Sequence, residues 1–139
     1  MVEQQLIDAR RASRQLLGLS DEKINTVLLA VADALVAATD DILAANALDL
    51  ARMDTANPKY DRLKLTPDRI AGIAADMRNV ASLPSPRVEI DRRVRPNGLV
   101  IRRVAVPFGV IGVIYEARPN VTADVFSLCF KSGNVCVLK

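Results

Sequence analysis

A chain of 139 residues is long enough for one ordinary domain, and because 50% of its residues are hydrophobic it can bury a core. A charged fraction of 25% and a net charge of +3 are near the average for globular proteins, so bulk charge indicates neither a nucleic-acid nor a membrane partner. The absence of histidine excludes catalysis by imidazole and removes the usual zinc ligand. No apolar stretch approaches the roughly 20 residues that a membrane-spanning helix needs, so no membrane partner is expected.

The first helices are predicted from caps and apolar spacing. Ser20 can cap a helix whose buried stripe repeats every three or four residues: Ile24, Val27, Leu28, Val31 and Leu35. A further helix is predicted from Asp40 to Met53, after a bend near Thr39. The run Thr66-Pro67-Asp68 supplies a cap, a first-turn proline and a first-turn acid. The helix that follows has apolar positions at Ile70, Ile73, Ala74, Met77 and Val80 and ends near Pro84.

After Pro86 the spacing becomes that of strands. Val88 to Arg95 and Leu99 to Val106 flank Pro96-Asn97-Gly98, where Asn-Gly supplies the positive φ angles of a tight hairpin turn. The arginines of this predicted hairpin are either a nucleic-acid footprint or part of a solvated or subunit-contacting ribbon. The ribbon is favoured because no aromatic residue is interleaved to stack on bases.

The last third of the chain has the pattern of a strand, a helix and a second strand. Gly109 to Tyr115 is continuously apolar, as in a strand buried on both faces of a parallel sheet. A helix capped at Thr122 and closed by Gly133 is predicted next, followed by a second buried strand from Asn134 to Leu138. The fold class is therefore α/β. Because a two-stranded parallel sheet is not stable by itself, further strands are expected after Lys139.

Glycines and cysteines in this part of the chain give weaker signals. Gly109 and Gly112 do not form the Gly-x-Gly-x-x-Gly fingerprint, so we expect them to allow close helix-to-sheet packing rather than cofactor approach. Cys129 and Cys136 lack the Cys-x-x-Cys spacing, which argues against a metal site and favours free thiols in a reducing cytoplasm. Cys129 is expected to be a core residue, because nothing nearby in sequence would lower its thiol pKa.

The candidate site is the loop Glu116 to Asn120, because ligands of open α/β sheets bind at the carboxyl ends of parallel strands. There Arg118 can bind a carboxylate or phosphate and Asn120 can donate an amide hydrogen bond, although such residues more often face solvent or cap a helix. Lys139 ends the second strand. It can reach a ribose or a phosphate, with an ordinary solvated strand end as the equal alternative.

Several motifs together closely resemble the gamma-glutamyl phosphate reductase family of the aldehyde dehydrogenase superfamily. They are Val106-Pro107-Phe108-Gly109-Val110-Ile111-Gly112-Val113-Ile114-Tyr115-Glu116-Ala117-Arg118-Pro119-Asn120-Val121-Thr122, Lys131-Ser132-Gly133-Asn134, Leu138-Lys139, Asp61-Arg62-Leu63-Lys64-Leu65-Thr66 with Arg69-Ile70, and Pro96-Asn97-Gly98-Leu99. The resemblance covers nearly the whole chain. It implies an N-terminal helical part of the cofactor-binding domain at 1–86, an oligomerisation hairpin at 87–106, and the first strand-helix-strand unit of a Rossmann-like NADP-binding sheet at 107–139.

The resemblance also implies an activity, the NADPH-dependent reduction of L-glutamyl 5-phosphate to glutamate 5-semialdehyde in proline biosynthesis. A cysteine beyond position 139 would form a thioester and be the nucleophile, so this piece alone should be inactive. Glu116, Ala117 and Lys139 would contact the cofactor, Arg118 the substrate and Asn120 the oxyanion. Asn120 is displaced, however, because Ala117-Arg118-Pro119-Asn120 replaces the Trp-Asn-Phe-Pro of general aldehyde dehydrogenases.

A cytoplasmic homo-oligomer is expected from the resemblance when the protein is full length. Two other classes stay open on the residues alone: a non-catalytic dinucleotide-binding or assembly module, and an arginine-rich nucleic-acid-binding domain. Binding of the second kind would weaken steeply with salt.

Overall fold

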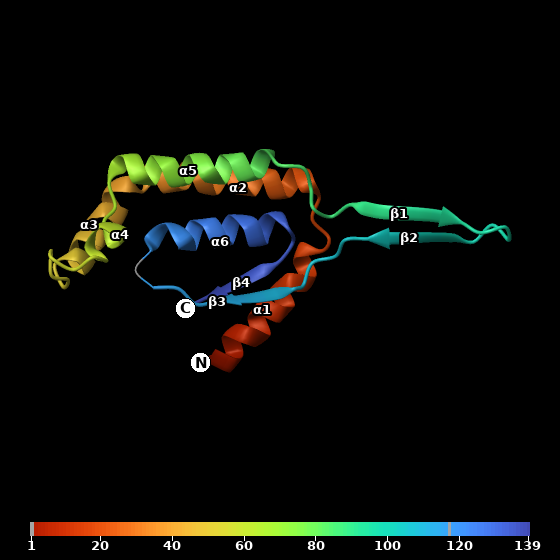
Figure 1. Cartoon of the computed structure of the whole chain (residues 1–139), viewed down its shortest axis with the longest axis horizontal. Coiled ribbons are helices and arrows are strands. Elements are labelled where there is room, and N and C mark those ends of the chain that lie inside the picture. Colours follow the sequence, from red (N-terminus) through yellow and green to blue (C-terminus); the bar gives the residue numbers. More distant parts are fainter. Residues whose placement is uncertain (1, 117) are drawn as a thin grey trace.

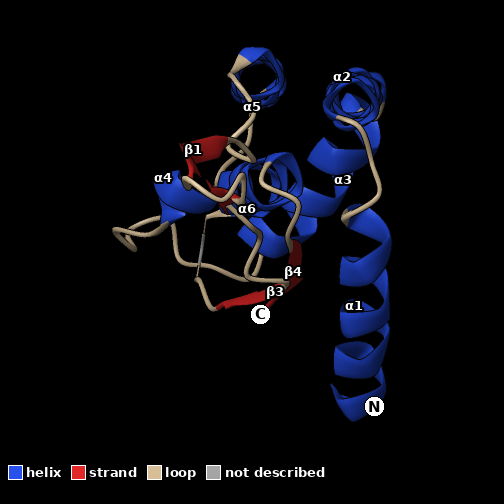
Figure 2. Ribbon diagram, turned by 90° about the vertical axis from the view of Figure 1, so that its right-hand side faces the viewer, coloured by secondary structure: helices blue, strands red, loops and turns tan. Residues whose placement is uncertain are grey.

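The computed structural model describes residues 2–116 and 118–139, arranged in layers (Figure 1). In chain order the elements are α1 (Val2–Leu16), α2 (Asp21–Ala37), α3 (Thr39–Leu50), α4 (Tyr60–Leu63), α5 (Pro67–Ser82), β1 (Glu89–Val94), β2 (Val100–Val104), β3 (Val110–Val113), α6 (Pro119–Lys131) and β4 (Val135–Leu138). Helices α2 and α5 lie side by side, α6 packs beneath them, and the sheet β3–β4 lies between α6 and α1 (Figures 1 and 2).

The core lies between α2 and α5. Ile24, Leu28 and Met77 are among its most buried side chains, with exposed fractions of 1%, 0% and 2%. Alanines of both helices complete the buried cluster, and Phe126 and Phe130 of α6 pack against it. The three-and-four spacing of the sequence therefore predicts the buried faces of both helices correctly.

The caps that begin α2 and α5 are also confirmed. The Ser20 hydroxyl accepts a hydrogen bond from the Lys23 amide at 3.2 Å, and the Thr66 hydroxyl accepts one from the Arg69 amide at 3.2 Å. Pro67 occupies the first turn of α5 as predicted. Helix α3 ends at Leu50, three residues before the predicted end at Met53.

The predicted cap of α6 is wrong. The helix begins at Pro119 rather than after Thr122, because a proline has the fixed φ of a first helical residue and needs no amide partner. The Thr122 hydroxyl instead hydrogen-bonds the Tyr115 hydroxyl. The predicted end is confirmed, since Gly133 has a φ of 78° and the Asn134 amide donates to the Cys129 carbonyl at 2.8 Å. This is the Schellman arrangement that favours glycine.

The parallel sheet forms as predicted, but its burial differs. Strands β3 and β4 pair from Val110↔Val135 to Val113↔Leu138. The expectation that the first strand is buried on both faces is wrong for this chain, because β3 is only half-buried and the following Ile114 is 84% exposed. A Cβ built on Gly112 would meet nothing within 4 Å, so close helix packing within the chain does not explain this glycine.

The hairpin β1–β2 is antiparallel and extends away from the layers (Figure 1). Its turn contains the three predicted residues Pro96, Asn97 and Gly98, because the Arg95 amide donates to the Leu99 carbonyl and the Gly98 amide to the Arg95 carbonyl, both at 2.9 Å. Gly98 has a φ of 81°, as a type I turn followed by a left-handed residue requires. Nearly every hairpin residue is exposed.

Two helices were not predicted individually. Helix α1 contacts β4 and β3 on the side of the sheet opposite α6, and the short α4 follows the Asn57-Pro58 loop. Among the residues that the structure describes, no helix is both long and apolar enough to cross a membrane.

Candidate functional site

A cavity of about 380 Å³ lies between α5 and the start of α6 and is called the α5–α6 pocket here. Helix α5 contributes Arg69, Gly72, Ile73 and Asp76. These positions follow the i, i+3, i+4, i+7 spacing and therefore lie on one helix face. Arg118, directly before α6, and Pro119, Asn120 and Asp124 in the first turns of α6 line the opposite side. The segment 61–65 lines a third side, called the third wall here.

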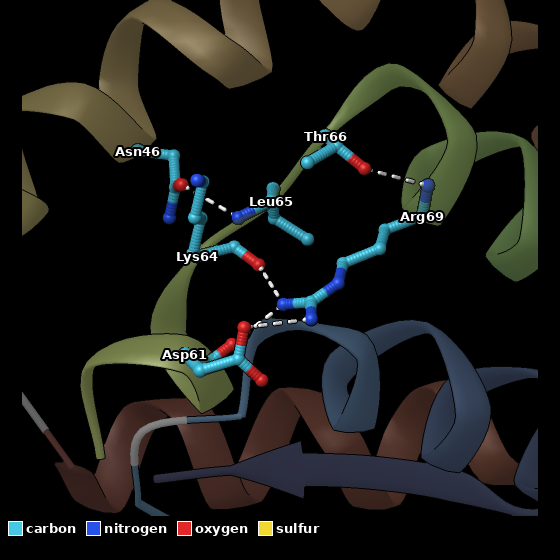
Figure 3. Close-up of polar contacts among 6 residues, drawn as sticks. All are labelled: Asn46, Asp61, Lys64, Leu65, Thr66 and Arg69. Carbon is cyan, nitrogen blue, oxygen red and sulfur yellow. Dashed lines mark hydrogen bonds and ion pairs between the residues drawn. The ribbon is translucent and has the colours of Figure 1, made fainter. Parts of the chain in front are cut away.

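That third wall is held by the buried Asn46 of α3, which is 6% exposed (Figure 3). The Asn46 amide nitrogen donates to the Leu63 carbonyl at 2.9 Å, and its oxygen accepts from the Leu65 amide at 2.8 Å. Both ends of the side-chain amide are thus satisfied, which offsets the cost of burying it. Asn46 thereby fixes the backbone where α4 ends and the connection to α5 begins.

Arg69 holds the same wall from α5 (Figure 3). Its guanidinium donates to the Asp61 and Lys64 carbonyls at 2.5 and 2.6 Å and to the Asp61 carboxylate at 2.9 Å. Three acceptors on one planar group give a fixed geometry, which a lysine would not reproduce. Together Asn46 and Arg69 rigidify the segment 61–65 at the mouth of the pocket.

The pocket has basic and acidic side chains in nearly equal number. Its basic residues are Arg62, Lys64, Arg69 and Arg118, and its acidic residues are Asp61, Asp76 and Asp124. Arg69 and Asp61 neutralise each other. Within residues 2–116 and 118–139, Arg62, Lys64, Arg118 and Asp76 have no side-chain hydrogen bond or ion pair. The chemistry fits a ligand that carries both signs of charge.

Two of the predicted site residues, Arg118 and Asn120, line this pocket, whereas Glu116 and Lys139 do not. The Glu116 carboxylate accepts from the Lys59 ammonium at 2.9 Å. Lys139 is exposed at the carboxyl end of β4, where its amide and carbonyl continue the ladder to Val113 and Tyr115. Ala117 lies outside the described residues.

Asn120 does not cap α6. It follows Pro119 in the first turn, and its amide nitrogen donates to the Asp124 carboxylate one turn later, at 3.0 Å. The capping alternative for Asn120 is therefore wrong, while its role as an oxyanion donor stays a prediction. The bond to Asp124 orients the side-chain amide on the pocket side of the helix.

Cys129 is a core residue as predicted, with 7% of its surface exposed. Burial raises the pKa of its thiol, and the neighbouring Cys136 raises it further. A raised pKa keeps the sulfur protonated, which is unsuited to a nucleophile. Among the described residues no group of three potential metal ligands comes together.

Some residues of the site were missed by sequence reasoning. Asn46 was counted only as a member of a helix, although a polar residue between apolar neighbours is itself a signal of a buried hydrogen-bonding role. Asp76 and Asp124 are charged residues in helices, a pattern typical of solvent-facing positions. Nothing in the neighbouring sequence indicates that they line a pocket. Only the packing of α5 against α6 brings them to one pocket.

No protein-family model matches the chain. Gamma-glutamyl phosphate reductase of Parabacteroides distasonis is 62% identical over 139 residues, which is 99% of this chain and 34% of the relative. The same enzyme of Bacteroides thetaiotaomicron is 65% identical over 129 residues, 92% of this chain and 31% of the relative. The chain thus spans about a third of the length of these curated relatives.

Solved structures show the same likeness. The crystal structure of gamma-glutamyl phosphate reductase from Thermotoga maritima superposes with a TM-score of 0.89 at 35% identity, over 94% of this chain and 32% of that chain. The enzyme from Saccharomyces cerevisiae gives 0.87 at 34% identity, over 94% and 34%. In sequence and in fold, this chain matches one third of a gamma-glutamyl phosphate reductase.

The match to gamma-glutamyl phosphate reductases confirms the resemblance stated from the motifs and the predicted fold class. Two of those motifs, 61–66 with Arg69 and 118–120, are far apart in sequence and meet at the α5–α6 pocket. Residues of two family-like motifs therefore meet at this pocket.

Proposed function

We propose that this chain is part of a gamma-glutamyl phosphate reductase, which reduces L-glutamyl 5-phosphate to L-glutamate 5-semialdehyde in proline biosynthesis. The observation that carries the proposal is the 62% identity across 99% of the chain to a curated enzyme of that name. Each turnover would transfer a hydride from NADPH, take up a proton and release phosphate. The nucleophile would be a cysteine of the whole protein beyond position 139.

On the substrate side, Arg118 is the residue proposed to bind an anionic group. It is exposed at the mouth of the α5–α6 pocket, next to Asn120. A guanidinium offers paired donors that match a carboxylate or a phosphate. Asn120 would donate its second amide hydrogen to the oxygen that becomes negative during the reaction, because its first is already engaged by Asp124.

Charged side chains at the carboxyl ends of β3 and β4 could bind a nicotinamide cofactor. Lys139 places an exposed ammonium at the carboxyl end of β4, where it can meet a ribose or a phosphate. Glu116 carries a carboxylate held by Lys59, which can accept from a ribose hydroxyl. NADPH, the proposed cofactor, would supply the hydride. Ala117 is proposed as a further cofactor contact, on the resemblance alone.

The hairpin β1–β2 is proposed as a contact between subunits of a cytoplasmic homo-oligomer. Ile90, Val94 and Ile101 are 54%, 65% and 44% exposed, so the hairpin has apolar surface that this chain leaves uncovered. Contact with a second subunit would remove that surface from water.

The test is an assay of the whole protein in the reverse direction. Glutamate 5-semialdehyde should reduce NADP⁺ only when inorganic phosphate is present, because phosphate is the second substrate of the reversed reaction. The 139-residue chain by itself should give no NADPH. Phosphate-independent reduction, or none with the whole, folded protein, would contradict the proposal.

A further inference from the structure

We propose that the α5–α6 pocket binds the α-amino-acid head of the substrate, with Asp76 and Asp124 receiving its ammonium group and Arg118 its carboxylate. This rests on the proposed function, since it names how that substrate is held. The glutamyl chain carries a charged pair at one end and the reacting acyl phosphate at the other, separated by two methylene groups. A pocket of about 380 Å³ is large enough for such a ligand.

The charges of the pocket favour a zwitterion over a simple anion. Asp76 projects from α5 and Asp124 from α6, so two carboxylates are brought to a site that also contains arginines. A phosphate alone would be repelled by both acids. An ammonium group beside a carboxylate satisfies both signs, because each can pair with an opposite charge.

Gly72 is a second, independent observation. It lies inside α5 on the pocket face, where a glycine destabilises a helix relative to alanine. A Cβ built there would meet nothing within 4 Å, so no contact within the described chain requires the glycine. A glycine here leaves space at the base of the pocket, and a bound ligand that occupies this space would explain why the position is a glycine.

The Asn120–Asp124 hydrogen bond links the proposed head site to the proposed reacting site. Asp124 is half-buried, and one of its oxygens accepts from Asn120 while the other has no partner among the described residues. An ammonium bound at the second oxygen would hold the Asp124 carboxylate in place. The amino-acid end of the substrate would thereby help to position Asn120 for the acyl end.

The inference is tested by substrate discrimination in the whole protein. Two aldehydes are compared in the phosphate-dependent reverse assay: glutamate 5-semialdehyde and glutarate semialdehyde, which lacks the amino group. We expect Asp76→Asn to lower the preference for the amino-acid substrate, as the ratio of kcat/KM values, on the order of tenfold or more. Glutamate 5-semialdehyde cyclises in solution, but wild type and variant are assayed with the same mixture. Cyclisation therefore does not affect the comparison between them.

Two further variants keep the result interpretable. Asp68→Asn removes the same charge from the same helix outside the pocket, and it should leave the preference unchanged. Gly72→Leu should raise KM for glutamate 5-semialdehyde on the order of tenfold, because its side chain fills the base of the pocket, while the unfolding midpoint is not lowered.

The outcomes separate the two proposals. If wild type shows no phosphate-dependent activity at all, the proposed function fails. If it is active and Asp76→Asn keeps full preference, only the pocket assignment fails.

Discussion

The helix pair α2–α5 and the hairpin β1–β2 are equally well signalled in the sequence, yet their side chains have opposite environments. Leu28 and Met77 are 0% and 2% exposed, whereas Val94 and Ile101 are 65% and 44% exposed. Caps and turn residues act locally, so they predict a helix or a hairpin wherever it lies. Burial depends on what packs against the element, and among the described residues no helix packs extensively against the hairpin.

The largest effect expected from this contrast is on stability. Leu28→Ala should lower the free energy of unfolding of the chain by about 2–5 kcal/mol, because it leaves a cavity in a fully buried site. Ile101→Ala in the hairpin should cost less than about 1 kcal/mol, since its side chain is already partly in water. Urea unfolding of the two variants measures both. Similar losses would mean that the hairpin is stabilised by contacts this structure does not contain.

A smaller loss is expected at the wall of the pocket. Asn46→Ala should reduce the free energy of unfolding by about 1–3 kcal/mol, because the Leu63 carbonyl and the Leu65 amide lose their partners. Asn79→Ala, on the exposed side of α5, is the matched control and should change it by less than about 0.5 kcal/mol. Amide exchange at Leu65 should quicken in the first variant alone, and unaltered exchange there would remove Asn46 from the wall.

The hairpin should matter more for assembly than for folding. In the whole protein, Ile90→Thr together with Ile101→Thr should weaken self-association on the order of tenfold, because both expose less apolar surface to a partner. Sedimentation equilibrium measures the change, with circular dichroism as the control for folding. An assembly of unchanged mass and affinity would show that the apolar surface of the hairpin has another use.

The smallest effect concerns the Arg87–Asp21 ion pair, which ties the residues before the hairpin to α2. The hydrogen bond from Arg87 lowers the pKa of the Asp21 carboxyl below its usual value. A lowered folded-state pKa gives stability that is present above the unfolded pKa of about 4 and is lost as pH falls through the folded value. Because Asp21 is half-exposed, Asp21→Asn should cost only about 0.2–1 kcal/mol at pH 7.

That cost should shrink as the pH is lowered below about 4, since wild-type Asp21 then becomes neutral too. Unfolding curves of wild type and variant at several pH values measure it. A difference that grows in acid would have the wrong sign for this ion pair.

Sequence reasoning succeeded where the signal is local and failed where it depends on distant neighbours. Ser20, Thr66 and Gly133 mark helix ends correctly because their hydrogen bonds join residues a few positions apart. Thr122 resembled a cap, but Pro119 already starts the helix. The half-buried state of β3 was missed because it depends on which elements cover the sheet.

The candidate site also contains some residues that the sequence predicts and others that it does not. The strand-end rule placed Arg118 and Asn120 at a pocket, and both line one. It did not predict Asn46, Asp76 or Asp124, because their role follows from the packing of α3, α5 and α6 rather than from any spacing. The ion pair between Lys59 and Glu116 was not predicted either, because its two residues are 57 positions apart in the chain.

The proposed role of Asn120 places the first turn of α6 in catalysis rather than only in folding. The direct test is Asn120→Ala in the whole protein, with kcat, substrate KM and the unfolding midpoint measured on one preparation. An oxyanion donor acts mainly in the transition state, so kcat should fall on the order of 100-fold while KM changes little and the midpoint stays near wild type. A stable variant with wild-type kcat would contradict the claim and move the oxyanion role to another group.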